Sequence, residues 1–183
     1  MMRMLWFVLL AVSALPSWAQ EWKVDYARSE IRFVIKQMNV PVDGGFGRFT
    51  VTPVFDPSRP ETGQFRVEVD VASIDTGSEE GNGEARRPAW FDAARYPKAR
   101  FVSTAIQRDG PGRYTMTGDV TVKGRTKSIA VPLVLVPQKP GGWLASGRFA
   151  LKRSDFGIGG GEWNDPSVVA DDIDGRFKIL LLP

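Results

Sequence analysis

Apolar and polar residues alternate along most of this chain, and this period of two constrains the fold more than any other feature. In the clearest segment, Phe65, Val67, Val69 and Val71 are separated by charged residues, which is typical of a half-buried β-strand. The same pattern predicts about nine strands, at residues 22–26, 31–35, 49–55, 65–71, 98–106, 114–122, 129–135, 143–153 and 177–181.

Short turn sequences join these segments, and no helices are interleaved with them, which favours an antiparallel sheet over a βαβ fold. Asp56-Pro57 and Lys123-Gly124 are two such turn signals, and Asp43-Gly44-Gly45 is predicted to be a third. We therefore expect an all-β protein, an extended antiparallel β-barrel of about eight strands, because closure removes exposed edges. A two-sheet sandwich with a filled core would produce the same alternation.

One segment, residues 78–96, departs from the β pattern. Its composition predicts one or two short helical turns that form a flap over the sheet. Pro88 limits the first turn and Pro97 ends the second, because proline disfavours helix in the residue before it. No linker divides the chain after residue 19, so residues 20–183 are expected to form one domain.

The N-terminus is typical of a secretory signal peptide, residues 1–19. Arg3 precedes a largely apolar run over residues 4–15, and Pro16 and Ala19 follow it. The run is shorter than the roughly 20 apolar residues that a membrane-spanning helix needs. We expect cleavage after Ala19 and a mature protein in an exported compartment, with no cysteine at the new N-terminus to carry a lipid anchor.

Composition excludes several kinds of chemistry. The chain contains no histidine and no cysteine, which excludes disulfides, the usual zinc sites, and Ser-His-Asp or Cys-His triads. The net charge of +3 is small and dispersed, so nucleic acid is not an expected partner.

No motif indicates catalysis, a metal or a cofactor. Asp75-Thr76-Gly77 matches the aspartic-protease triplet, but a catalytic dyad needs two such aspartates, so Asp75 is interpreted as a turn residue. The glycine-rich residues 156–161 lack the flanking elements of a phosphate-binding loop and are predicted to form an ordinary loop. The aspartates within residues 165–174 do not match the EF-hand spacing, and exposed turns are predicted for them.

The flap carries two arginines, Arg86 and Arg87, close to Trp90 and Phe91. Guanidinium groups pair well with phosphate oxygens, so the two arginines are candidates for holding an anionic head group. The alternative is a solvated helix face that the two aromatic residues pin to the core. The basic residues around Gly124 are interpreted as a hairpin tip that serves solubility.

Eight short motifs, which occur in order along the chain, resemble those of the YceI-like family. Together they cover essentially all of the chain after the signal peptide. They are Trp22-x-Val24-Asp25, Ser29-x-Ile31-x-Phe33, Gly45-Phe46-Gly47-x-Phe49, Ser73-Ile74-Asp75-Thr76-Gly77, Trp90-Phe91-Asp92 with Tyr96-Pro97, Phe101-x-Ser103-Thr104, Gly118-Asp119-x-Thr121-x-Lys123-Gly124-x-Thr126-Lys127 and Arg153-x-Asp155-Phe156-Gly157.

The resemblance implies an extended, lipocalin-like β-barrel with a helical flap. It also implies a periplasmic protein that binds a long polyisoprenoid amphiphile, a quinone or a polyprenyl phosphate, in the barrel lumen. Family members often carry histidine where this chain has Arg28, and again near Gln37 and Glu84, so any role of those histidines cannot operate here. Residues 161–171 resemble a branch found alongside b-type membrane cytochromes, which favours a quinone-like ligand and a transient contact with the membrane or with such a cytochrome.

A long tail fits the energetics of binding better than a small ligand does. Each buried CH₂ contributes ~0.8 kcal/mol, so about eight carbons contribute roughly 6 kcal/mol, which an association cost of about 4 to 15 kcal/mol can cancel. We assume that the apolar face of every strand points inward, although a one-residue slip in register would invert that face. Nine residues are then expected to contact the ligand. They are Phe33, Phe65, Val67, Phe101, Met116, Val131 and Phe149 in the lumen, and Trp90 and Phe91 at the flap.

Two other interpretations stay open. The first is an enzyme that modifies such a lipid, or a protein partner of a quinone-linked membrane cytochrome. The absence of histidine, cysteine and a cofactor motif counts against the enzyme. A non-enzymatic protein-interaction module with a filled barrel is the other, and it would bind its partner through the flap or an open rim.

Overall fold

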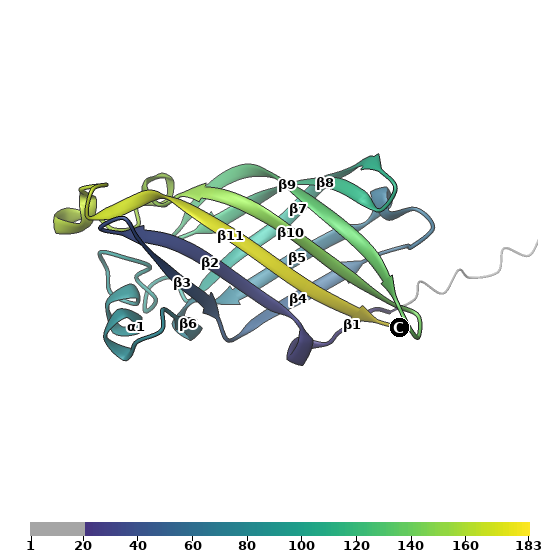
Figure 1. Cartoon of the computed structure of the whole chain (residues 1–183), viewed down its shortest axis with the longest axis horizontal. Helices are drawn as coiled ribbons and strands as arrows, with labels where there is room; N and C mark the ends of the chain where they lie inside the picture. Colours follow the sequence, from purple (N-terminus) through teal and green to yellow (C-terminus); the bar gives the residue numbers. More distant parts are fainter. Residues whose placement is uncertain (1–20) are drawn as a thin grey trace, which may run out of the picture.

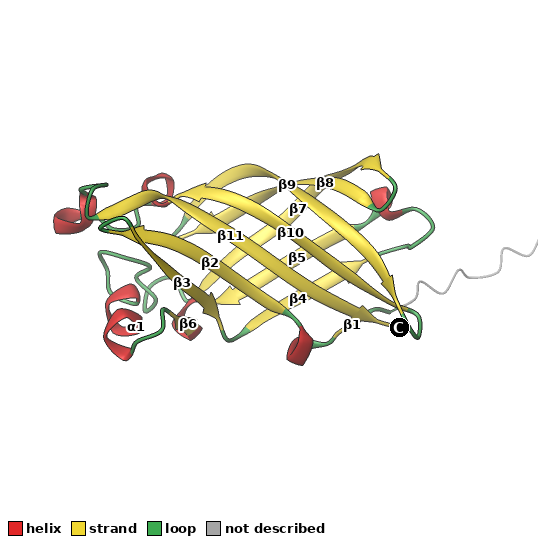
Figure 2. Cartoon of the chain, in the orientation of Figure 1, coloured by secondary structure: helices red, strands yellow, loops and turns green. Residues whose placement is uncertain are grey.

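The computed structural model of the chain describes residues 21–183, and the predicted signal peptide lies outside them. One curled antiparallel sheet makes up most of this part of the chain (Figure 2). The hydrogen-bonded strand order is β4-β5-β7-β8-β9-β10-β11-β2-β3-β6, and β1 pairs with β11. The strands are β1 (Lys23–Val24), β2 (Glu30–Gln37), β3 (Val40–Phe46), β4 (Phe49–Val54), β5 (Gln64–Asp70), β6 (Ile74–Asp75), β7 (Lys98–Gly110), β8 (Arg113–Val122), β9 (Arg125–Gln138), β10 (Gly142–Lys152) and β11 (Val169–Leu182).

The predicted fold class, an all-β, extended and lipocalin-like antiparallel barrel, is confirmed. The long strands cross the molecule obliquely and wrap around a common interior (Figure 1). A single sheet replaces the alternative sandwich of two sheets. Within residues 21–183 no pairing joins β3 to β4, so main-chain hydrogen bonds leave the barrel open along that seam.

The predicted turn at Asp43-Gly44-Gly45 is wrong, because these residues lie inside β3. The turn of the β2–β3 hairpin is instead at Met38 and Asn39, whose φ angles are 47° and 64°. Two residues with positive φ form the tight connection that matches strand twist. Gly44 lies directly opposite Phe33 on β2. In the sequence this glycine resembles a turn signal, but in the structure it is a strand residue next to a large ring.

The predicted helical flap is present at one end of the sheet (Figure 1). It begins with α1 (Glu79–Ala85), whose N-terminus is capped by the Ser78 hydroxyl accepting from the Gly81 N–H at 3.1 Å. A second turn follows, in which the Tyr96 N–H donates to the Asp92 carbonyl at 2.8 Å. None of the helices in the described part of the chain has the length and hydropathy of a membrane span.

The remaining helical elements are short 3₁₀ turns. The glycine-rich segment forms a loop between two of them, as predicted. The prediction of exposed turns for the four aspartates holds only for Asp165, because Asp171, Asp172 and Asp174 lie in β11. The 3₁₀ turns are η1 (Tyr26–Arg28), η2 (Pro60–Thr62), η3 (Val71–Ser73), η4 (Arg153–Phe156) and η5 (Gly161–Asn164).

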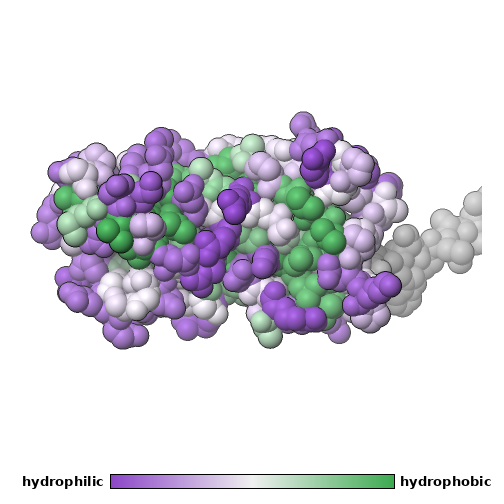
Figure 3. All heavy atoms as spheres, in the orientation of Figure 1, coloured by the Kyte–Doolittle hydropathy of each residue, from purple (hydrophilic) through white to green (hydrophobic). Residues whose placement is uncertain are grey.

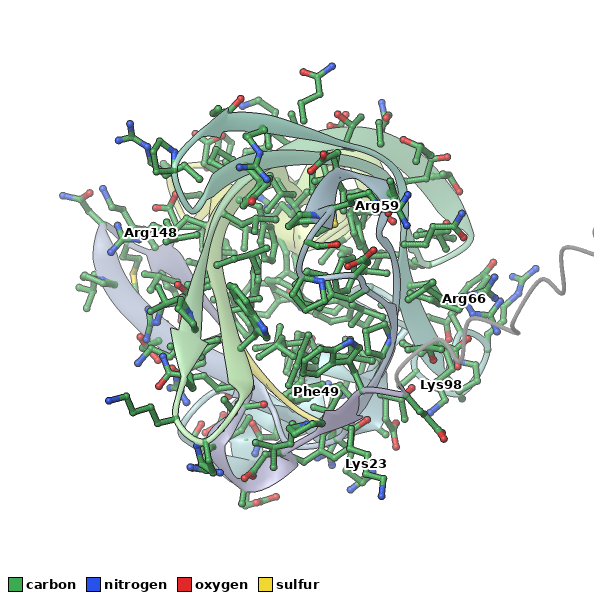
Figure 4. The ribbon with its side chains drawn as sticks, turned by 90° about the vertical axis from the view of Figure 1, so that its right-hand side faces the viewer. Lys23, Phe49, Arg59, Arg66, Lys98 and Arg148 are labelled. Atoms are coloured by element: carbon green, nitrogen blue, oxygen red, sulfur yellow. The ribbon has the colours of Figure 1, made fainter. Side chains whose placement is uncertain are left out.

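An aromatic plug closes the interior at the end opposite the flap. We use this name for Trp22, Phe55 and Trp143. The centroid of the Phe55 ring lies 5.6 Å from that of Trp22 and 5.9 Å from that of Trp143. The Trp22 indole N–H donates to the Phe55 carbonyl at 2.8 Å, and Leu181 beside them is fully buried. Figure 4 faces this end and shows the strands encircling a packed interior, with Arg66, Lys98 and Arg148 outside the ring.

Candidate functional site

A cavity of about 840 Å³ lies inside the curled sheet, and its wall is mostly apolar. All nine residues predicted to contact a ligand line it, so the strands that carry seven of them, β2, β5, β7, β8, β9 and β10, present the face that the alternation indicated. Their role in binding stays a prediction. They are Phe33, Phe65, Val67, Trp90, Phe91, Phe101, Met116, Val131 and Phe149.

Phenylalanine is frequent in the wall of the cavity, and several of its rings occupy the space that a side chain at a neighbouring glycine would fill. A Cβ added at any of these glycines would come within 3.0 Å of a ring carbon, a distance that real Cβ atoms do not show. Each glycine therefore leaves room beside the sheet for a ring that would otherwise lie further into the lumen. The pairs are Phe33 with Gly44, Phe101 with Gly118, Phe177 with Gly147 and Phe149 with Gly175.

The cavity reaches solvent at the flap end, where its wall turns polar. Gln37, Ser78, Glu80 and Arg87 line it there and are exposed. Arg87 Nη1 lies 2.9 Å from a carboxylate oxygen of Glu84, which is also in the wall. Gln37 and Glu84, near which the resemblance implies histidine in other family members, therefore line the cavity, whereas Arg28 does not.

Of the two predicted head-group arginines, Arg87 lines the cavity and Arg86 does not. The other arginines in the wall also have carboxylate partners. Arg100 Nε lies 2.8 Å from Glu68 Oε1, and Arg32 pairs with Asp43, a contact that raises the pKa of the Arg32 guanidinium.

Lys123 fastens the flap to the barrel. Its ammonium donates to the Pro88 carbonyl at 2.7 Å and to the Gly157 carbonyl at 2.9 Å. Burial lowers the pKa of Lys123, because the charged form loses hydration. The interpretation of the β8–β9 tip as a solubility feature is thus wrong for Lys123, which bridges the flap and the loop after η4.

Arg153 organises the loop that carries Trp163, a wall residue that the sequence analysis did not select. The side chain is only 2% exposed. Its guanidinium donates at 2.8–3.1 Å to five main-chain carbonyls, those of Ile158, Gly159, Trp163, Val169 and Ala170. A tryptophan inside a glycine-rich loop was the signal available in the sequence, since large aromatic residues in loops usually contact something.

Known proteins resemble this chain in sequence and in structure. Protein YceI from Escherichia coli O157:H7 is 30% identical over 162 residues, which cover 83% of each chain. A UPF0312 protein from Pseudomonas syringae pv. syringae is 32% identical over 142 residues, 75% of this chain and 72% of its own. The crystal structure of Burkholderia cenocepacia BcnA superposes with a TM-score of 0.83 at 39% identity, over 86% of this chain and 99% of that one.

A more distant structure has the same fold. A polyisoprenoid binding domain from Saccharophagus degradans superposes with a TM-score of 0.70 at 15% identity, over 88% of this chain and 97% of that one. The family model of the YceI-like domain matches residues 22–180, which is nearly all of the described chain. The chain therefore belongs to the YceI-like family.

Proposed function

We propose that this protein binds and carries a long polyisoprenoid amphiphile, holding the tail in the cavity and catalysing no reaction on it. The observation that carries the proposal is a cavity of about 840 Å³ whose wall is mostly apolar. Its volume lies in the upper part of the range of roughly 300–1,000 Å³ that small-molecule sites occupy. A structural neighbour described as a polyisoprenoid binding domain supports the same ligand class.

The charges at the mouth favour an uncharged head group, such as a quinone, over a polyprenyl phosphate. Arg87 already pairs with Glu84, and Glu80 adds a second carboxylate to the wall. A phosphate placed there would meet two negative groups and a cation that has a partner, which disfavours its binding. The quinone is therefore the ligand that we propose, and the polyprenyl phosphate is the alternative.

The site of action that we propose is the periplasm, with brief contact between the protein and a membrane. The signal-peptide pattern supports export. The β2–β3 hairpin tip supports the membrane contact, because Met38 and Val40 are 69% and 62% exposed and Gln37 beside them lines the mouth. Figure 3 shows apolar residues on the surface at the end of the molecule where this hairpin lies, and also at the opposite end.

The test is to express the chain with its own signal peptide, purify it from the periplasm without detergent, and record native mass spectra. We expect a discrete added mass that fragments as an isoprenoid, and its fragments distinguish a quinone from a polyprenyl phosphate. An apo mass that stays unchanged after incubation with both lipids would contradict the proposal.

A lumen variant tests the assignment of the cavity. Phe101→Asp places a carboxylate in the apolar wall, where it loses hydration and cannot be balanced by an apolar tail. We expect export to persist and the bound lipid to be lost. Val102→Asp, on the neighbouring outward face and already 37% exposed, is the matched control that keeps the lipid.

A further inference from the structure

Two hydrogen-bond donors in the wall of the cavity have no acceptor. Among the residues that the structure describes, the indole nitrogens of Trp90 and Trp163 are the buried side-chain polar atoms without a hydrogen-bond partner. The two rings are neighbours, with centroids 5.6 Å apart and planes tilted by 56°. Both residues line the cavity, one from the flap and the other from η5.

Such a pair calls for an explanation, because buried polar groups in native proteins are nearly always hydrogen-bonded. The same molecule satisfies another buried indole, since the Trp22 N–H donates to the Phe55 carbonyl at 2.8 Å. Two unsatisfied donors side by side, on the wall of a cavity that can hold a ligand, indicate that the ligand brings the acceptor.

The main chain around both indoles is fixed without using either indole nitrogen. Next to Trp90, the Ala89 carbonyl accepts from the Gly159 N–H at 2.8 Å. The Trp163 carbonyl accepts from Arg153 at 2.8 Å. The flap and the loop are thereby joined to each other and to the barrel, so the main chain that carries both indoles is in place before any ligand arrives and only the two side chains have to move, which lowers the ordering cost of binding.

Resting on the carrier function proposed above, we infer that Trp90 and Trp163 form the head-group site and donate hydrogen bonds to a neutral acceptor oxygen. An indole N–H is only a donor, so the head group has to present acceptor oxygens; the carbonyl oxygens of an oxidised quinone do so without adding a negative charge beside Glu80 and Glu84. Each nitrogen is shielded in this structure, and the head group reaches it as the two rings move apart.

This recognition also separates the two redox forms of a quinone. The hydroxyls of the reduced quinol must donate as well as accept, and a quinol proton facing two indole donors has no acceptor there. A buried donor left unpaired weakens binding. We therefore expect the oxidised quinone to bind more tightly than the quinol does, by about tenfold.

The test is nuclear magnetic resonance of the purified protein with ¹⁵N-labelled tryptophan. After residue 19 the chain contains Trp22, Trp90, Trp143 and Trp163, and Trp→Phe variants assign their indole signals. A ubiquinone with a four-isoprene tail is added in one titration, and a hydrocarbon with the same tail and no head group in another. We expect the indole protons of Trp90 and Trp163 to shift downfield with the quinone only, while Trp22, already hydrogen-bonded, does not respond.

Affinity measurements supply the second readout. Trp90→Phe and Trp163→Phe keep an aromatic ring and remove one donor each, so each is expected to weaken quinone binding roughly five- to tenfold more than it weakens hydrocarbon binding. Both variants shrink a ring of the packed pair, so a lower melting temperature is expected from each, and the comparison of quinone with hydrocarbon separates this packing loss from the loss of the donor. Val102→Ala, on the outward face of β7 and 37% exposed, is the control that changes neither Kd.

The outcomes separate this inference from the carrier function. Equal shifts with the quinone and the hydrocarbon, or quinone binding that leaves both indole signals and both variant affinities unchanged, would overturn the head-group site while the carrier function stands. If neither probe binds, the carrier function itself is wrong, and the head-group site falls with it.

Discussion

Gly175→Ala is expected to fill part of the cavity without unfolding the protein. The three atoms nearest to a Cβ at this position would be ring carbons of Phe149, whereas at Gly44, Gly118 and Gly147 a main-chain oxygen is among the nearest three. The Phe149 ring has free space on its lumen side, because it lines the cavity. The ring is therefore expected to swing off the wall of β11 and into the lumen.

The size of the effect follows from what the ring displaces. A cavity of about 150 Å³ holds a benzene molecule, so the ring occupies a substantial part of the 840 Å³. It excludes roughly one isoprene unit, whose five carbons contribute about 4 kcal/mol at ~0.8 kcal/mol each. Since about 1.4 kcal/mol is a factor of ten, the Kd for a polyisoprenoid is expected to rise on the order of a hundredfold, with about a thousandfold as the ceiling.

The assay is a titration of the delipidated protein with a ubiquinone, followed by tryptophan fluorescence. The destabilisation is expected to be about 1–3 kcal/mol from overpacking, partly offset by the lower entropy of the unfolded alanine chain. Gly83→Ala, where an added Cβ meets nothing within 4 Å, is the control that leaves the Kd unchanged. The double variant Gly175→Ala/Phe149→Ala removes the displaced ring and restores binding. Wild-type affinity in Gly175→Ala, or failure of the double variant to recover it, would refute the account of ring and glycine.

Three further perturbations test other features. Arg153→Lys keeps the charge but offers three donors to five carbonyls. We expect the free energy of unfolding to fall by about 2–4 kcal/mol and the melting temperature to fall by roughly 5–15 °C. An unchanged melting temperature would contradict this prediction. The hydrogen bond from Arg32, and then that from Arg176, holds the pKa of Asp43 below its ordinary 3.8, so its contribution to folding is complete above pH 3.8 and is lost as the pH falls through the lowered pKa. Asp43→Asn should therefore flatten the pH dependence of the free energy of unfolding in this acid range, and an equally steep curve would count against the role of the ion pair. The double variant Met38→Asp/Val40→Asp is expected to slow ubiquinone uptake from vesicles on the order of tenfold and to leave equilibrium loading unchanged, because the hairpin tip loses apolar surface that can contact the bilayer. The control is Val54→Asp, at a 60% exposed residue next to Phe55 of the plug. Equal uptake rates in the double variant and the wild type would show that the tip takes no part in the transfer.

The strands and the inward face of the sheet could be predicted because they follow one physical rule. Alternation at Phe65 and Val67, or at Met116, fixes which side chains are buried, and the structure places all of these in the cavity wall. The rule fails at Gly44, because a glycine under a ring has the same sequence signature as a turn.

Features that depend on the main chain of distant segments could not be predicted. Lys123 and Arg153 act by donating to carbonyls, and every residue has a carbonyl, so no partner residue type marks these contacts in the sequence. The position of Trp163 follows from that network. Its indole became a candidate donor only when the structure placed it beside Trp90.

The aromatic plug limits the length of tail that the cavity can hold. Under the proposed carrier function, a tail that enters at the flap can extend no further than the plug of Trp22, Phe55 and Trp143, so the height at which its head group stands would depend on how many isoprene units lie below. Too few units leave the head group short of the rim, and too many push it out above the flap. A homologous series of lipids would thus be sorted by its number of repeats, although every member presents the same head group and the same repeating unit.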